Sequence, residues 1–148
     1  MSLIEDKLRK LGFQLQPAKP SVANYLGCKR SGDMLFAAGR VSELIGEVGT
    51  DVTEEEAKMA ARDTVLLILA IIKQEIKDLD LIRDIIKVHG FIRSSPTFTR
   101  QPYVLDGASD LLVQLFGDNG RHARTATGVN QLPFGACIQV DIILQLKP

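Results

Sequence analysis

The sequence predicts one α+β domain over residues 1–148, in which a six-stranded mixed sheet carries two long helices on one face. The chain is long enough for a single core. Its apolar residues recur at strand and helix spacings in the order β-β-β-α-β-α-β-β. Six strands about 4.8 Å apart span roughly 29 Å and one helix covers about 10 Å, so two or three helices cover only one face.

Composition argues against several classes of partner. Eighteen basic and eighteen acidic side chains cancel, so no overall field attracts nucleic acid or anionic lipid. The two cysteines, Cys28 and Cys137, lack the spacing of a metal site and are expected to be small buried side chains. We therefore expect no nucleic-acid partner and no metal.

The first residues do not resemble a targeting signal. Five of the first ten are charged, and they enclose no apolar segment like that of a signal peptide. The longest apolar run, residues 65–72, is much shorter than the ~20 residues that a membrane-spanning helix needs. These features predict a cytoplasmic protein that does not cross or bind a membrane.

Residues 1–20 are predicted to form an N-terminal extension of one helix and one brief strand. Ser2 and Glu5 have the spacing of a capping box, and Gly12 is placed to end the helix. Residues 13–16 alternate apolar and polar side chains, which indicates a short strand.

A hairpin is predicted for residues 23–41, with its turn at residues 31–33. Gly39 interrupts the apolar run of the second strand. A glycine there is typical of a bulge or of a close approach by another group, and equally of a plain bend.

Two long helices are predicted further along. The first begins after Thr53, which has the capping-box spacing with Glu56, and it is so apolar that we expect it to be covered on more than one side. The second covers residues 103–116. Between them, residues 80–93 have the composition of a strand that contains His89, interpreted as a hydrogen-bonded core or edge residue.

Residues 121–148 are predicted to form a closing hairpin around a Leu-Pro-Phe-Gly turn. One row of side chains on the last strand is entirely apolar and suits the face under the helices. The opposite row is Cys137, Gln139, Asp141, Ile143 and Gln145. Such a mixed face is typical of a subunit interface with clefts, so we expect a homo-oligomer.

Arg124 lies in the first strand of this hairpin. Judged alone, an arginine in such a place is most often a solvated surface charge, and the alternative is an anchor for an anionic ligand. Tyr25 is likewise either a core or interface aromatic or the wall of a cleft. His122 stands beside a glycine-rich turn and is expected to be exposed and not catalytic.

Four residues or motifs of the chain have the spacing found in one protein family. Arg124 precedes a Leu-Pro pair by eight positions, and Gln139 follows that proline by six. Upstream, Tyr25 precedes Gly39 by 14 positions. From about residue 25 to the C-terminus, this arrangement resembles the RidA/YjgF family. The resemblance implies the chorismate-mutase-like fold, assembled as a homotrimer with three ligand clefts between subunits.

The resemblance also implies an activity. In the deaminase branch, an arginine binds the carboxylate of a reactive 2-imino acid or its enamine tautomer, and water attacks the imine carbon to release ammonia and a 2-oxo acid. No cofactor is required, since an imine is already electrophilic. Gln139 and Asp141 are the implied catalytic residues. The implied substrate-binding residues are Arg124, Thr125, Ala126, Tyr25, Gly39, Pro133 and Ser109.

The chain departs from the family pattern at several positions. Gln139 stands where the deaminase branch has a glutamate, and an amide cannot take a proton from water at neutral pH. Asp141 lies about 7 Å further along the same strand face and could take that role. Ala38 replaces a serine before the family glycine, and the stretch over residues 94–109 is longer than usual.

Three functions therefore remain open from the sequence. The first is a hydrolase of the 2-iminobutanoate/2-iminopropanoate deaminase type. The second is a non-catalytic trimer that binds a small carboxylate metabolite, which Gln139 favours. The third is RNA cleavage, against which the balanced charge and the lack of a basic patch with interleaved aromatics both argue. The sequence also leaves open the strand register of the predicted closing hairpin, which decides whether Arg124 and Gln139 share a face of the sheet.

Overall fold

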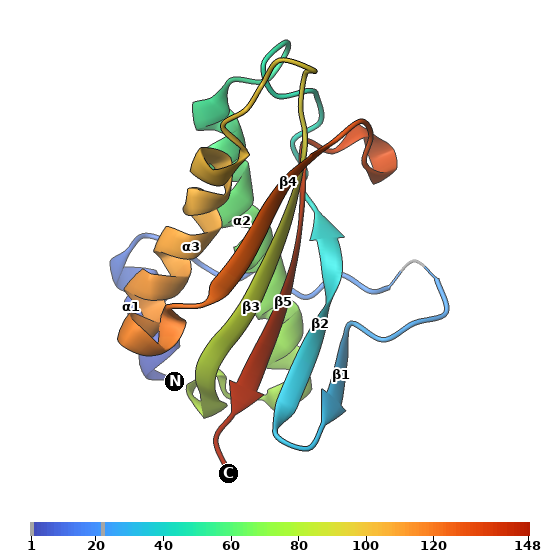
Figure 1. Ribbon diagram of the computed structural model, residues 1–148. Coiled ribbons are helices and arrows are strands. Elements are labelled where there is room, and N and C mark those ends of the chain that lie inside the picture. Colours follow the sequence, from blue (N-terminus) through green and yellow to red (C-terminus); the bar gives the residue numbers. More distant parts are fainter. Residues whose placement is uncertain (1, 22) are drawn as a thin grey trace.

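The computed structural model describes residues 2–21 and 23–148 (Figure 1). Short 3-10 helices lie in three connections: η1 (Leu79–Leu81), η2 (Gly117–Gly120) and η3 (Pro133–Gly135). The longer elements are, in order, α1 (Leu3–Lys10), β1 (Cys28–Ser31), β2 (Met34–Val41), α2 (Glu54–Ile76), β3 (Ile82–Arg93), α3 (Gln101–Phe116), β4 (Ala123–Val129) and β5 (Ile138–Leu146). The α+β class and both long helices are confirmed.

The described residues form a five-stranded sheet in the order β1-β2-β5-β3-β4. β4 runs parallel to β3, and the other neighbouring pairs are antiparallel. The predicted closing hairpin is wrong, because β4 and β5 both pair with β3, which lies between them. Two neighbouring parallel strands need a crossover connection, and α3 provides it.

The predicted sixth strand, near the N-terminus, is also wrong. Phe13 and Leu15 pack partly buried against the core, and the guanidinium carbon of Arg62 on α2 lies 4.9 Å from the centre of the Phe13 ring. The alternation of this segment therefore reflects packing on a helix rather than pairing in the sheet. The first hairpin is confirmed with a shorter first strand, which begins at Cys28 rather than near residue 24, and Gly32 lies in the left-handed region at its turn (φ 61°).

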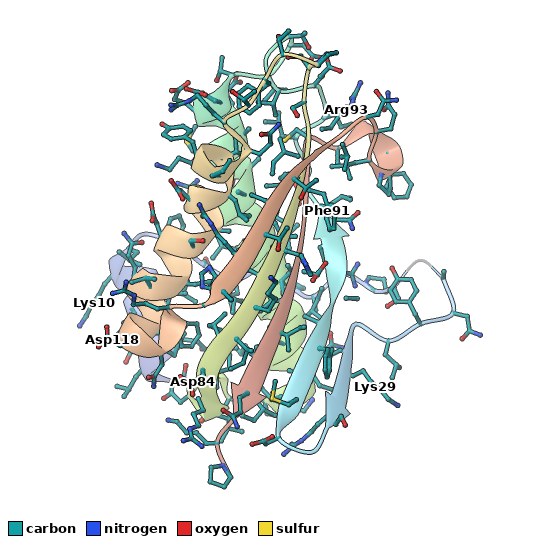
Figure 2. All side chains as sticks on the ribbon, viewed as in Figure 1. Lys10, Lys29, Asp84, Phe91, Arg93 and Asp118 are labelled. Atoms are coloured by element: carbon teal, nitrogen blue, oxygen red, sulfur yellow. The ribbon has the colours of Figure 1, made fainter. Side chains whose placement is uncertain are left out.

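One face of the sheet is buried under the helices. α2 contacts β2 and β5, and α3 contacts β3 and β4, so both helices lie on the same side (Figure 1). The predicted apolar row of the last strand faces them, and each of its members on β5 is at most 2% exposed: Ile138, Val140, Ile142, Leu144 and Leu146. No helix of the described residues covers the other face, on which Phe91 lies in register with Gln139 (Figure 2).

Side-chain caps fix the helix ends. The Thr53 hydroxyl accepts from the backbone N–H of Glu56, whose carboxylate accepts from the Thr53 N–H, so the predicted capping box is confirmed. Ser2 caps α1 through one half of the predicted box, since its hydroxyl accepts from the Glu5 N–H while the Glu5 carboxylate pairs with Lys73. The Asp80 carboxylate also accepts from two backbone N–H groups at the start of α1, which joins this helix to η1.

The segment expected to be a longer loop, residues 94–109, is a loop only as far as residue 100. α3 begins at Gln101 with a proline at its start, a position where the missing N–H of proline costs nothing. Among the described residues, no helix has both the length and the apolar character needed to cross a bilayer.

α3 packs against α2 without room for a side chain at Gly107. A Cβ atom built there would lie 1.9 Å from the carbonyl oxygen of Lys58 on α2. The neighbour is backbone, so it cannot rotate away, and the two helices would have to separate.

Gly107→Ala is therefore expected to lower the free energy of unfolding by about 1–3 kcal/mol, measured by urea denaturation. Helix propensity alone predicts the opposite sign, a gain of about 1 kcal/mol. Gln114→Ala, at an exposed position of the same helix, is the matched control and should change stability by less than about 0.5 kcal/mol. A Gly107→Ala protein as stable as the wild type would contradict this packing.

Candidate functional site

β4 places Arg124 on the helix-covered face of the sheet. In the strand register Arg124 pairs with Val88 of β3, which pairs with Ile142 of β5. Both partners are fully buried under the helices. Because directly paired residues point to the same side, the Arg124 side chain lies beside α3.

Three groups of α3 contact the guanidinium of Arg124. Its Nη1 lies 2.7 Å from Oδ1 of Asp106 and donates to Oγ of Ser109 at 3.1 Å. Its Nη2 donates to the carbonyl oxygen of Pro102 at 3.2 Å. Among the described residues, none of these contacts uses Nε. Arg124 is therefore no solvated surface charge, and its Nε edge is the part left for a further anion.

His122 extends this network. Its Nδ1 lies 2.7 Å from the carbonyl oxygen of Gly120 and its Nε2 lies 2.9 Å from Oγ of Ser109. A carbonyl only accepts, so the proton is assigned to Nδ1, and Nε2 accepts from the Ser109 hydroxyl. Hydrogen bonds thus run in one direction from Arg124 through Ser109 and His122 to Gly120, an arrangement in which each bond polarises the next.

The expected exposure of His122 is wrong, because the side chain is half-buried. Burial lowers the pKa of His122, and the charge of Arg124 lowers it further, against an opposing contribution from the hydrogen bond to Gly120. The imidazole is therefore neutral near pH 7, as its role as an acceptor for Ser109 requires.

A second group of polar side chains lies on the uncovered face of the sheet. Gln139 pairs with Phe91, and Asp141 pairs with His89. Nδ1 of His89 lies 3.4 Å from Oδ1 of Asp141, and the rings of His89 and Phe91 stack with centroids 6.0 Å apart. His89 is thus neither a core nor an edge residue. It lies on the open face of an inner strand, beside a carboxylate.

β2 bulges next to Gln139. Its pairing with β5 advances three residues, from Ala37 to Arg40, while β5 advances only two. A Cβ on Gly39 would lie 3.2 Å from Nε2 of Gln139. Gly39 therefore belongs to a bulge and also admits the close approach of the amide, which decides against a plain bend.

The pleat separates the predicted site residues into two sets. Arg124 and Ser109 meet on the helix-covered side, whereas Gln139, Asp141 and Gly39 meet on the open side. A β-strand directs successive side chains to opposite faces, so no rotamer brings Arg124 and Gln139 of one chain together.

The other predicted substrate-binding residues lie outside these two sets or beside one of them. Ala126 follows Arg124 on the helix side and packs against the core, and Thr125 faces the open side, where Lys87 Nζ donates to its hydroxyl at 3.0 Å. Tyr25 lies in an exposed connection with 44% of its surface accessible, and Pro133 begins η3.

Three polar side chains of these sets were not predicted as site residues: Asp106, His122 and His89. Asp106 and Ser109 stand three apart on a predicted helix, and that spacing places them on one face. This spacing was therefore a sequence signal for Asp106 as a partner of Ser109. No sequence signal indicates that His89 lies beside Asp141, because this contact depends on which strands are neighbours in the sheet. The described residues contain no group of three or more His, Cys, Asp and Glu side chains that could hold a metal ion.

Comparison with known proteins identifies clear similarities. The family model described as "YjgF/chorismate_mutase-like, putative endoribonuclease" matches residues 5–146. Protein TCP17 of Trypanosoma cruzi is 38% identical over 147 residues, which cover 95% of this chain and 92% of that protein.

Solved structures are similar at two levels. The protein Atu1372 from Agrobacterium tumefaciens, described as of unknown function, gives a TM-score of 0.91 at 38% identity, over 97% of this chain and 92% of that chain. The YjgF gene product from E. coli gives a TM-score of 0.62 at 19% identity, over 88% and 93%. The latter likeness concerns the fold alone.

The charge of Arg124 can be detected through His122. Arg124→Gln is expected to raise the pKa of His122, measured by NMR titration of its ring protons, because one of the two effects that lower it is removed. Arg121→Gln, at an exposed position nearby, is the control and should leave this pKa unchanged.

The same shift has a consequence for stability. The folded state favours neutral His122, so its contribution is present above the unfolded pKa of about 6.5 and is lost as the pH falls through the folded value. A wild-type His122 pKa at or above the unfolded value would contradict the network.

Proposed function

The chain belongs to the YjgF/chorismate-mutase-like family, and from this membership we propose that it hydrolyses reactive 2-imino acids, or their enamine tautomers, to 2-oxo acids and ammonia. The reaction takes place in clefts between the subunits of a homotrimer. The observation that carries the proposal is Arg124, which α3 holds through Nη1 and Nη2 while the contacts of the described residues leave its Nε edge unused.

Arg124 binds the substrate carboxylate. In a guanidinium, the Nε–H and one N–H of Nη2 lie on the same edge, and such a fork matches the two oxygens of a carboxylate. Asp106 holds the arginine in place when no substrate is bound. The negative charge of Asp106 also repels a second carboxylate. Substrate binding therefore weakens the Arg124–Asp106 ion pair while an ion pair between Arg124 and the substrate forms.

Two copies of the chain complete the cleft. Arg124 lies on β4, an edge strand, where a neighbouring copy can reach it, and Gln139 lies on the open face. That face also carries Phe36, which is 43% exposed and pairs with Ile143. Covering this apolar surface with another copy removes it from water and brings one chain's Gln139 toward its neighbour's Arg124.

Water attack needs an orienting group and a proton acceptor. The Gln139 carbonyl accepts a hydrogen bond from the water but cannot take its proton. The His89–Asp141 pair on the same face accepts that proton as the water oxygen bonds to the imine carbon. The C=N electron pair moves to nitrogen, which receives this first proton and becomes an amino group on the hydroxyl-bearing carbon. The hydroxyl then transfers its remaining proton, through the same pair, to the amino group, the C–N bond breaks, and ammonia leaves as the C=O bond forms.

A non-catalytic trimer that binds a small carboxylate metabolite is the second candidate. Gln139 favours it, because an amide replaces the glutamate of the deaminase branch beside the backbone of Gly39. We do not extend the endoribonuclease description of the family model to this chain, since its basic and acidic side chains balance.

Ammonia release from freshly generated 2-iminobutanoate tests the first candidate. Arg124→Gln is expected to lower kcat/KM about 10- to 100-fold, the value of one hydrogen-bonded charge. Asp106→Asn is expected to lower KM, because it removes the competing carboxylate, and Arg121→Gln should change neither constant.

The outcome also separates the two candidates. A folded trimer that releases no ammonia above the uncatalysed rate, but whose Tm rises with 2-oxobutanoate, is the result expected of the second candidate. If the folded protein shows no turnover and its Tm does not rise with 2-oxobutanoate, both candidates are overturned.

Mixed oligomers test the composite cleft. Arg124→Gln and Gln139→Ala chains are each expected to lose at least about nine-tenths of the activity, and refolding them together should restore it to roughly a quarter of the wild-type value, because a random pair of neighbours has that chance of supplying both intact residues. Recovery of no activity from proven hetero-oligomers would show that both residues are needed within one chain.

A further inference from the structure

A cavity of about 410 Å³ lies beside β2, on the helix-covered side of the sheet. Leu67 and Ile71 of α2 form part of its wall, with Pro17 from the segment before β1 and Phe134 from η3. The volume and the apolar walls are those of a site for a small organic molecule, for which ~300–1,000 Å³ is usual.

Arg40 gives this cavity a charge. It pairs in register with Val140, which is fully buried under the helices, so its side chain lies on the helix side. Nη2 of Arg40 lies 3.9 Å from the position of a Cβ on Gly27, and the same position lies 2.7 Å from Cγ2 of Ile71. The guanidinium is therefore close to α2 and to the chain that leads into β1.

The guanidinium of Arg40 is poorly paired. Its Nε is sealed from solvent and has no hydrogen-bond partner among the residues that the structure describes. Its Nη2 donates to the carbonyl oxygen of Lys19 over 3.4 Å, a long bond. A half-buried charge with such weak partners costs stability, and native proteins normally compensate it.

The neighbouring acidic groups do not neutralise Arg40. Glu43, the carboxylate among the lining residues, accepts instead from Lys19 at 2.8 Å. Burial, with a contribution from Glu75, raises the pKa of the Cys28 thiol to about 11 although Arg40 acts to lower it. The thiol is neutral at pH 7. Lys19, Arg40 and Glu43 together leave the cavity with one positive charge.

We propose that this cavity binds a small monocarboxylate with an apolar chain. The carboxylate pairs with Arg40 and Lys19, and the chain lies against Leu67 and Ile71. Arginine suits this role because its planar fork matches a carboxylate, and the ligand supplies the counterion that the chain itself does not.

This site is separate from the proposed catalytic cleft. β5 and β3 lie between β2, which carries Arg40, and β4, which carries Arg124, so the two strands are roughly 14 Å apart. Gly39 is adjacent to Arg40 in sequence, but it faces Gln139 on the other side of the sheet.

Titration of the full chain with hexanoate, followed by the methyl NMR signals of Ile71, tests the proposal. Hexanoate is expected to shift these signals in the wild type, and 1-hexanol should bind about tenfold more weakly, because it lacks the charge that Arg40 recognises. Arg40→Gln should weaken hexanoate binding by about the same factor. Arg124→Gln should leave it unchanged, which separates this site from the cleft.

Stability provides a second readout. Arg40→Gln is expected to keep the Tm of the unliganded protein or to raise it, because an uncompensated charge is removed. A large fall in Tm would identify Arg40 as a structural residue and overturn the proposal. Equal affinity for hexanoate and 1-hexanol, or Ile71 signals unmoved at millimolar hexanoate, would overturn it without any variant.

Discussion

The pleat of the sheet is the constraint on which the arrangement of the functional side chains depends. β5 and β4 flank β3, and pairing across β3 sets which residues share a face: Arg124 aligns with Val88, and Gln139 with Phe91. Since neighbouring positions of a strand alternate, a change of register by one residue would exchange the two faces. The same alternation that buries the core row of β5 therefore divides the polar residues between two sides of the molecule.

Arg124 combines a fixed position with an incomplete set of partners. Ser109, Pro102 and Asp106 all belong to α3, a helix that packs tightly on α2 around Gly107, so the guanidinium is held by a rigid part of the fold. Preorganisation of this kind lowers the entropy lost when a ligand binds. The Asp106 carboxylate has the opposite effect, because it competes with any anionic ligand for the guanidinium.

Local signals in the sequence predicted local structure well. The capping box at Thr53, the turn at Gly32 and the apolar row of the last strand all lie within one element, and each is confirmed. The errors concern relations between elements. The final two strands have the spacing of a hairpin, yet β3 lies between them, and Phe13 alternates with polar neighbours because it packs on α2. Strand order and helix packing depend on long-range contacts, and for the same reason the approach of Asp106 to Arg124 and of His89 to Asp141 could not be derived from periodicity.

The bulge at Gly39 links the two sides of the molecule through one strand. Before it, Ala37 faces the helices opposite Ile142; after it, Arg40 faces them opposite Val140, three residues later instead of two or four. The additional residue keeps both side chains on the helix side, whereas regular alternation over the same three residues would direct Arg40 to the open face beside Gln139. In evolutionary terms, substitutions that straightened β2 here without changing its length would transfer a positive charge from one proposed binding surface to the other, whereas a one-residue deletion that removed the bulge would leave Arg40 on the helix side. Homologues that keep this length but lack the bulge would therefore be expected to differ in ligand as well.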